Sequence, residues 1–417
     1  MYNPSASQKR IYNLVEKISK GQFTDDDSFL KKLVEDIVNN PEFQIKGGRI
    51  WRFLPLERSY ELIFQYGDIR EIPKNYKLTV DEQPVLKELY KKNTMLRKET
   101  DQILKESGIF IYSVTGVGSI VRTEYGRFYE YVLGFNADEI LQSFYDTLSI
   151  ISTVASSRLK EIEVLKERKK IQKDISKAAE IQRNLFPEHQ VEFSDFEIYG
   201  LCIPDNEIGG DYFDYFPNLE SEENRIGVLV ADAASKGLSA AIQSLFVSGA
   251  VKMAHKFSPK ISALFYYLNN LIYETFPLER FVTLFYCEIT ESSNRLVLYA
   301  NAGHTEPIHF RREDNSFRFL TSTGGILGIV PNQKFNVENI RMKPGDILLI
   351  VTDGITEATN SEDIPFGHEQ LVDLILQYKD LSAKDIALNI IEKVQHFYAT
   401  SQYNDDKTLI VIKRKLN

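Results

Sequence analysis

Four aspartates in the C-terminal half of the chain stand at the ends of predicted β-strands. They are Asp211 in IGGDYFDYF, Asp232 in RIGVLVAD, Asp353 in DILLIVTDG and Asp405 just before DKTLIVIKR. These positions are far apart in the sequence, so only tertiary folding can unite them. A single aspartate beside glycine is commonly a turn residue, because its side chain bonds to its own backbone.

Four aspartates that each adjoin an apolar, β-branched run are harder to explain as turns. Buried carboxylates repel one another, so they must be neutralised by protons or by cations. Hard divalent ions such as Mg²⁺ and Mn²⁺ prefer oxygen ligands. The pattern therefore predicts a two-metal site.

The elements that position these aspartates are short strands connected by turns. Strands are predicted at seven segments, and helices at about 234–256, 261–275 and 368–399; the strands are FEIYGLCI, YFDYF, RIGVLVA, FVTLFYCEI, RLVLYAN, DILLIVT and TLIVIKR. Because strands follow one another without strict alternation with helices, we expect antiparallel sheets covered by helices. The predicted fold class is α+β.

The N-terminal part is predicted to be a separate α/β unit joined to the rest by a long helix. TDDDSFLKKLVEDIVNN has the capping acids and apolar spacing of a helix, GRIWRFLPLERSYELIFQYG reads as two strands, QPVLKELYKKNTMLRKETDQILKESG as helices, and IFIYSV and RFYEYVLGF as strands. From about 137 to 185 there is no Pro or Gly. We expect domains at 1–155, 156–187 and 188–417.

The linker helix carries a short heptad pattern. Ile171, Ile175, Ala178 and Leu185, with Gln182 in register, follow the spacing of a coiled-coil seam. Leu159, Ile162 and Leu165 lie in a different phase, and a break in phase changes the winding of a coiled coil. A surface helix docked on a neighbouring domain explains the pattern equally well.

Composition excludes several classes of protein. The 417 residues carry 50 Lys and Arg against 59 Asp and Glu, a net charge of -9 that disfavours nucleic-acid binding. Only Cys202 and Cys287 are present, too few for a disulfide framework or a cysteine zinc site, and both lie in apolar strands expected in the core. We find no transmembrane run and no signal peptide, so we expect a cytoplasmic protein without membrane insertion.

Eight motifs occur in an order that resembles one family. They are AAEIQRNLFP, GGDYFDYF, VADAASKGLSAAI, FVTLFYCEI, YANAGHTEPI, GGILGI, VTDGITEATN and NDDKTLIVI. Over residues 178–417 the chain is similar to the bacterial PPM-type, SpoIIE/RsbU-like metal-dependent serine/threonine protein phosphatases. The N-terminal unit resembles a GAF-type sensor module, although no ligand-binding signature accompanies it.

The resemblance implies a catalytic site with two Mn²⁺ or Mg²⁺ ions. Asp232 would bridge the ions together with the backbone carbonyl of Ala233. Asp353 and Asp405 would complete the shell of one ion, and Asp211 would lie at the other. Two such ions lower the pKa of a shared water and clamp the phosphoryl oxygens, so no protein nucleophile is needed.

The sequence leaves the roles of several residues near these aspartates undecided. Asp406 is an alternative to Asp405, and glycines 209, 210 and 354 would let the backbone approach the metals. His304 in NAGHTEP is a candidate general acid, or else a loop histidine that bonds backbone. Relatives usually have Gly where this chain has Ser235, and a positive φ there would cost about 1 kcal/mol.

Two rival functions remain. GGDYF resembles the GGDEF signature of diguanylate cyclases, but Tyr212 replaces an acidic residue. A phosphatase-like scaffold that signals by binding alone is the second, and Ser235 is its main support. The resemblance implies instead a sensor-regulated phosphatase that acts on a phosphorylated STAS-type anti-sigma-factor antagonist. It also implies a homodimer formed through the linker and an unidentified small-molecule or protein signal at the N-terminal unit.

Overall fold

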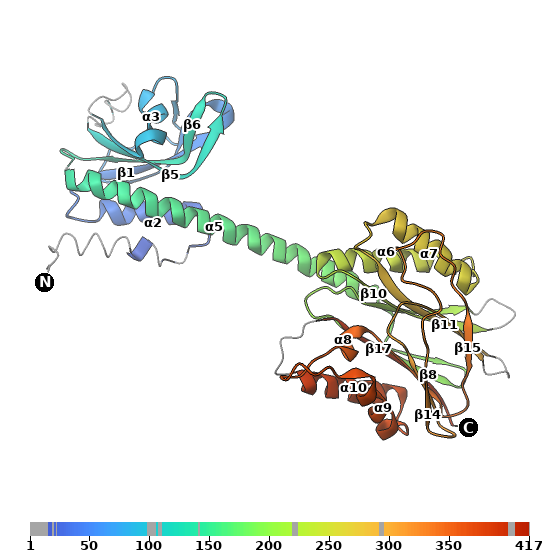
Figure 1. Cartoon of the computed structure of the whole chain (residues 1–417). Helices are drawn as coiled ribbons and strands as arrows, with labels where there is room; N and C mark the ends of the chain where they lie inside the picture. The colour runs from blue at the N-terminus through green and yellow to red at the C-terminus, as the bar shows by residue number, and fades with distance from the viewer. Residues whose placement is uncertain are drawn as a thin grey trace. The chain divides into compact units, whose positions relative to one another are not determined.

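The computed structural model of the chain describes residues 16–18, 21, 23–97, 106, 111–140, 142–218, 224–291, 296–398 and 405–416. The chain divides into two compact units, residues 1–171 and 172–417 (Figure 1). The boundary falls inside one long helix, α5 (Gln142–Arg183), within the segment 156–187 that the sequence assigns to a linker. None of the described helices combines the length and apolar character needed to cross a bilayer.

Unit 1 is built on a six-stranded antiparallel sheet. Its spatial order is β3-β2-β1-β6-β5-β4. The strands are β1 (Gly47–Leu54), β2 (Ser59–Gly67), β3 (Lys77–Thr79), β4 (Thr94–Arg97), β5 (Tyr112–Thr123) and β6 (Gly126–Asn136). The expected strand pair and the two later strands are confirmed.

Helices cover both faces of this sheet. Helix α2 (Asp26–Val38) is capped by Asp25, whose carboxylate accepts a hydrogen bond from the backbone amide of Ser28. It packs on one face together with the first turns of α5, and α3 (Pro84–Lys92) packs on the other. The expectation of helix after α3 is wrong at 94–97, where a strand forms; 98–105 and 107–110 lie outside the described residues.

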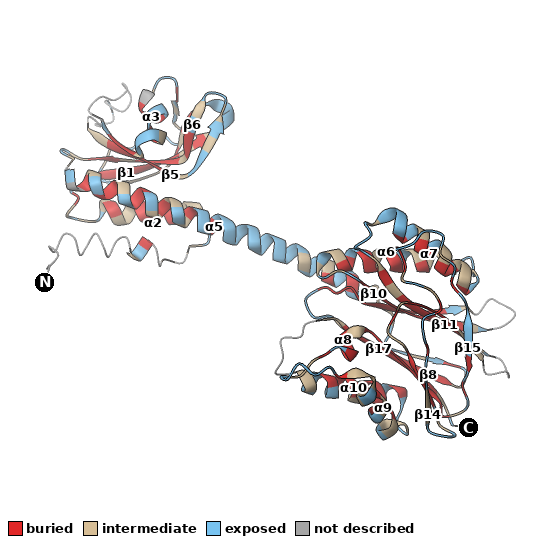
Figure 2. Ribbon diagram, viewed as in Figure 1, coloured by how far each residue is buried: buried red, intermediate tan, exposed pale blue. Residues whose placement is uncertain are grey.

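Helix α5 is packed at both ends and exposed in the middle (Figure 2). Its first turns place Phe144, Leu148 and Ile151 in the core of unit 1. Residues 163–174 are all exposed. The helix begins later than the 137 expected from sequence, because 137–140 are not helical.

Unit 2 contains two antiparallel sheets. One has the order β15-β12-β11-β10-β9 and the other β14-β13-β16-β17-β8-β7. The strands are β7 (Gln190–Phe193), β8 (Phe196–Ile203), β9 (Tyr212–Asn218), β10 (Arg225–Ala233), β11 (Val282–Thr290), β12 (Leu296–Ala302), β13 (Ile308–Arg311), β14 (Ser316–Phe319), β15 (Glu338–Arg341), β16 (Ile347–Val351) and β17 (Lys407–Arg414). All seven predicted strands are present; β7, β13, β14 and β15 were not predicted.

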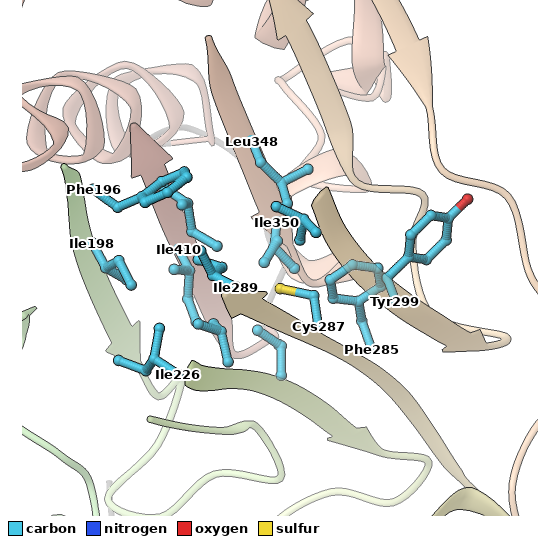
Figure 3. Packing of buried hydrophobic residues seen from close by; sticks show 14 of the residues in the cluster. Phe196, Ile198, Ile226, Phe285, Cys287, Ile289, Tyr299, Leu348, Ile350 and Ile410 are labelled. Carbon is cyan, nitrogen blue, oxygen red and sulfur yellow. The ribbon is translucent and has the colours of Figure 1, made fainter. Parts of the chain in front are cut away.

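The two sheets pack face to face around a continuous apolar core (Figure 3). Ile226 and Phe285 from one sheet meet Ile198, Ile350 and Ile410 from the other. Cys287 lies in this core, where burial raises the pKa of its thiol, so it is no candidate nucleophile.

Helices cover the outer face of each sheet and complete a four-layer sandwich. Helices α6 (Leu238–His255) and α7 (Ile261–Thr275) pack on the β9–β12 sheet. The short α8 (Asp353–Thr356), with α9 (Gly367–Tyr378) and α10 (Ala383–Tyr398), packs on the other. The expected α+β class is confirmed, but the single helix expected at 368–399 is wrong, because the chain turns between 379 and 382.

Candidate active site

The structure brings the four predicted aspartates to one edge of the sandwich. Asp211 precedes β9 and Asp232 is the next-to-last residue of β10, and these two strands are neighbours in one sheet. Asp353 follows β16 and Asp405 precedes β17, both in the other sheet. Their carboxylates are close enough to raise one another's pKa values, as Asp232 does for Asp211 and Asp405 does for Asp353. Residues remote in sequence therefore form one acidic cluster.

Asp211 is the most deeply buried member of this cluster. Its side chain is 2% exposed, and one carboxylate oxygen accepts a hydrogen bond from the Thr352 hydroxyl at 2.8 Å. The Thr352 hydroxyl also accepts the Thr408 amide at 3.0 Å. Burial, followed by the charges of Asp232 and Asp406, raises the pKa of Asp211 well above its ordinary value. Deprotonated Asp211 thus needs a nearby cation.

Asp232 and Asp353 have the same electrostatic difficulty. Burial is the largest cause for both, and it raises the pKa of Asp232 to about 7 and that of Asp353 to about 6. Neighbouring carboxylates add to each shift: Asp353 and Asp405 act on Asp232, and Asp405 acts on Asp353. Such mutual destabilisation of charged forms is typical of a site that binds cations.

The pair Asp405 and Asp406 divides into two different roles. The Asp405 carboxylate forms an ion pair with Lys236 at 3.0 Å, on the open side of the cluster. The Asp406 carboxylate accepts backbone amides from Asp205 at 2.8 Å and from Gly210 at 2.5 Å. Asp406 therefore holds the loop before Asp211, which leaves Asp405 as the better candidate ligand.

Close packing around Asp406 explains two glycines of this region. A Cβ on Gly354 would lie 1.8 Å from the Asp406 carbonyl oxygen, and one on Gly209 would lie 2.6 Å from its carboxylate. No side chain fits at either position. These glycines thus let three chain segments meet at the acidic edge.

The cluster is not a preformed metal cage. Among the described residues, no three His, Cys, Asp or Glu side chains converge closely enough to hold an ion as they stand. Asp405 is turned to Lys236 and Asp211 to Thr352, as expected for carboxylates that repel one another. The donor chemistry nevertheless fits hard divalent cations, because all four groups supply oxygen. The carbonyl of Ala233 lies beside them and accepts the Ser235 amide at 2.7 Å.

The strain expected at Ser235 is absent. Ser235 is not among the residues with positive φ, whereas Gly237, two residues later, has φ +64°. The Ser235 hydroxyl donates a hydrogen bond to the Gln243 side chain at the start of α6. Serine in place of glycine therefore does not distort the backbone that carries Asp232, and the main support for an inactive scaffold is lost.

His304 lies in a setting that favours its structural interpretation over the general-acid one. The side chain is 3% exposed, its Nδ1 lies 3.1 Å from the Thr283 hydroxyl, and its backbone is held by the side chain of Asn301. Burial lowers the pKa of His304 to about 4. A neutral, enclosed imidazole lacks the acidic proton that a general acid gives to a leaving group at pH 7.

A residue that sequence reasoning placed only in the heptad register holds the active-site loop. The Gln182 side-chain Nε2 donates a hydrogen bond to the Gly209 carbonyl at 2.7 Å, and the Gly209 backbone N–H donates one to the side-chain Oε1 of Gln182 at 3.2 Å. Nearby, Ile175 and Ala179 of the same helix end pack against Ile208. This contact favours the docked-helix interpretation for 175–182. The only sequence signal for this role of Gln182 was its position as a polar residue among the apolar residues of the heptad seam.

A cavity of about 480 Å³ adjoins this contact. It extends from Gln182, at the end of α5, and Phe186, just after this helix, to Asp211. The segment after α5 thus lines a space that reaches the deepest aspartate.

Comparisons with known proteins relate the C-terminal part of the chain to one family. Residues 222–415 match the family described as Stage II sporulation protein E (SpoIIE). The chain is 27% identical over 252 residues to phosphoserine phosphatase RsbU of Bacillus subtilis. The aligned region covers 60% of this chain and 72% of that relative. The chain is 26% identical over 270 residues to protein IcfG of Synechocystis sp., covering 58% of this chain but only 41% of that relative.

One solved structure supports the fold. The SiaA-PP2C domain of Pseudomonas aeruginosa superposes with a TM-score of 0.50 at 17% identity, covering 59% of this chain and 98% of that domain. The similarity lies in the fold alone. The GGD sequence here belongs to this sandwich, so its match to the cyclase signature carries no weight.

Proposed function

We propose that the chain is a metal-dependent protein serine/threonine phosphatase of the PPM type, because residues 222–415 match the SpoIIE family and the chain is similar to a phosphoserine phosphatase. The observation that carries the proposal is the acidic cluster at the edge of the sandwich. Carboxylates from four strand ends meet there, the pKa values of Asp211, Asp232 and Asp353 are raised, and Lys236 is a cationic partner at the rim.

Two Mn²⁺ or Mg²⁺ ions fit this cluster in donor type and charge. Asp232 and the carbonyl of Ala233 would hold both ions, Asp353 and Asp405 would hold one, and Asp211 would hold the other. When bound, the ions supply Lewis-acid activation of the attacking water and charge stabilisation for the phosphoryl oxygens.

The surrounding residues orient the ligands. Thr352 orients the Asp211 carboxylate by donating a hydrogen bond to one of its oxygens. Asp406 fixes the backbone before Asp211 through amide hydrogen bonds. Lys236 is exposed on the rim, where it can attract an anionic phosphate once Asp405 is engaged elsewhere. A protein nucleophile is not required.

The proposed substrate is a phosphoserine or phosphothreonine on a partner-switching protein of the STAS type. Similarity to a phosphoserine phosphatase of Bacillus subtilis supports the phosphoserine part. The STAS-type partner rests on the resemblance of the eight motifs to phosphatases of partner-switching pathways.

Regulation is proposed to pass through the end of α5. The contact between Gln182 and Gly209 connects this helix directly to the loop that carries Asp211. The exposed stretch 163–174 offers Val164, Leu165 and Ile171 as apolar contacts for a homodimer. The GAF-type character of unit 1 and the signal it senses belong to the same proposal.

The function is tested by phosphate release from a phosphoserine peptide. We expect release by the full chain that depends on added Mn²⁺ and is lost in Asp232→Asn. Release by the same protein from a phosphorylated STAS-type domain should be faster than from the peptide, if that class is the substrate. A folded chain that binds Mn²⁺ but releases no phosphate from either substrate would favour a signalling scaffold.

A further inference from the structure

Unit 1 encloses a small cavity between its sheet and helix α3. The cavity measures about 50 Å³, which is room for about four water-sized groups. Trp51 of β1, Leu86 of α3, and Val114 and Val132 of β5 and β6 contribute to a largely apolar wall. A dry apolar wall of this kind normally surrounds an apolar ligand or nothing.

One side chain in this wall is out of place. Arg49 lines the cavity, is only 4% exposed, and lies on the same strand as Trp51. One terminal nitrogen donates to the Asn136 side chain at 3.0 Å and the other to the Arg70 carbonyl at 3.0 Å. Its Nε is buried without an acceptor among the described residues. A guanidinium has five N–H donors, so two contacts leave it under-satisfied.

No carboxylate among the described residues compensates the charge of Arg49. Burial alone lowers the pKa of Arg49 to about 10, and no described Asp or Glu opposes the shift. Arg49 therefore stays positive at neutral pH. A buried, unpaired charge is costly, and a bound anion would relieve that cost.

We propose that this cavity binds a short-chain monocarboxylate. The planar carboxylate pairs with the Arg49 guanidinium, which matches its fork geometry, and the short aliphatic body packs against Trp51 and Leu86. The small volume and apolar wall fit propionate or its close homologues better than a phosphate ester, whose additional oxygens would need more donors. The proposal concerns unit 1 only and is independent of phosphatase activity.

The chain contains a natural reporter for this site. Trp51 is its only tryptophan, so intrinsic tryptophan fluorescence of the full chain reports on the cavity wall. We expect propionate to change the emission saturably, and propionamide, which has the same shape without the charge, to have no such effect. Equal concentrations of potassium chloride control for ionic strength.

Three variants locate the binding. Arg49→Gln should weaken propionate binding at least tenfold. Gly134→Ala adds a methyl group inside the cavity at 3.7 Å from the Trp51 ring nitrogen, an ordinary contact, so it should block binding without disturbing the fold. Arg127→Gln removes the same charge from an exposed position of β6 and should keep the affinity within twofold. Thermal unfolding confirms that each variant is folded.

The proposal is overturned by any of three results with folded protein. One is the absence of a saturable change with acetate, propionate or isobutyrate. Another is equal affinity in Arg49→Gln and Arg127→Gln, or full binding by Gly134→Ala. The third is a response to inorganic phosphate but not to any carboxylate. If Arg49→Gln fails to fold, the comparison of Gly134→Ala with wild type still decides.

Discussion

Replacing Gln182 by alanine should impair catalysis without touching any aspartate. The substitution removes both hydrogen bonds to the Gly209 backbone, at 2.7 and 3.2 Å, and leaves buried polar groups without partners. At about 1 kcal/mol for each neutral hydrogen bond, the loop before Asp211 loses about 2 kcal/mol of support. A shift of that size corresponds to about a 30-fold change in the population of the active loop.

The assay measures phosphate release from a phosphoserine peptide over a range of Mn²⁺ concentrations. We expect kcat/KM to fall by up to about 30-fold and the Mn²⁺ concentration for half-maximal rate to rise, because Asp211 follows the loop. Glu180→Ala, on the exposed face of the same helix turn, is the matched control and should leave both parameters unchanged.

The result that refutes the reasoning is specific. A folded Gln182→Ala protein whose kcat/KM and Mn²⁺ requirement stay within twofold of wild type would show that the loop holds its position without α5. The regulatory route through the helix end would then be lost, while the phosphatase assignment would stand.

Three further outcomes follow from the acidic cluster. Because the folded pKa of Asp232 is raised to about 7 from 3.8, the stabilising contribution of this residue is complete below about pH 4 and is lost as the pH rises through 7. In EDTA, the melting temperature of wild type should therefore fall more between pH 5 and 8 than the melting temperature of Asp232→Asn. Addition of Mn²⁺ should abolish this difference. Asp405→Asn should raise the Mn²⁺ requirement without lowering the melting temperature of the metal-free protein. Asp406→Asn should lower that melting temperature by about 4 °C, because it weakens backbone amide hydrogen bonds worth about 1 to 2 kcal/mol. Equal melting temperatures for the two variants would contradict the separate roles of Asp405 and Asp406. Ser235→Gly should destabilise the chain by about 1 kcal/mol in urea unfolding, because it loses a side-chain hydrogen bond and gains freedom in the unfolded state; a stabilised variant would mean that Ser235 is strained after all.

The strands that carry the candidate site could be predicted because their patterns are strong. The strands in RIGVLVAD and DILLIVTD are buried on both faces, so each is marked by a long apolar run. The aspartate that ends each segment is therefore placed at the end of a strand. The strands β7, β13, β14 and β15 have only four residues each and no clear alternation, so their pairing is decided by neighbouring strands.

Side-chain roles within the site depended on tertiary contacts. Only resemblance to the family motif favours Asp405 over Asp406 in NDDKT; the structural distinction comes from the backbone amides of the 205–210 loop, which is remote in sequence. Likewise, the hydrogen bond from Ser235 to Gln243 of α6 and the burial that lowers the pKa of His304 arise only in the folded chain. These facts are set by burial and long-range packing, which a single sequence does not encode in local patterns.

The heptad register of the linker has a consequence for the proposed dimer. Ile175 and Gln182, which the pattern assigns to a coiled-coil seam, are occupied in the contact with Ile208 and Gly209. A dimer that pairs through the exposed stretch 163–174 leaves this contact intact. Pairing that continued along the same seam to Leu185 would compete with it, because one side chain cannot fill both sites. The length of the paired segment, and not dimerisation alone, would therefore decide whether Gln182 stays on the catalytic loop.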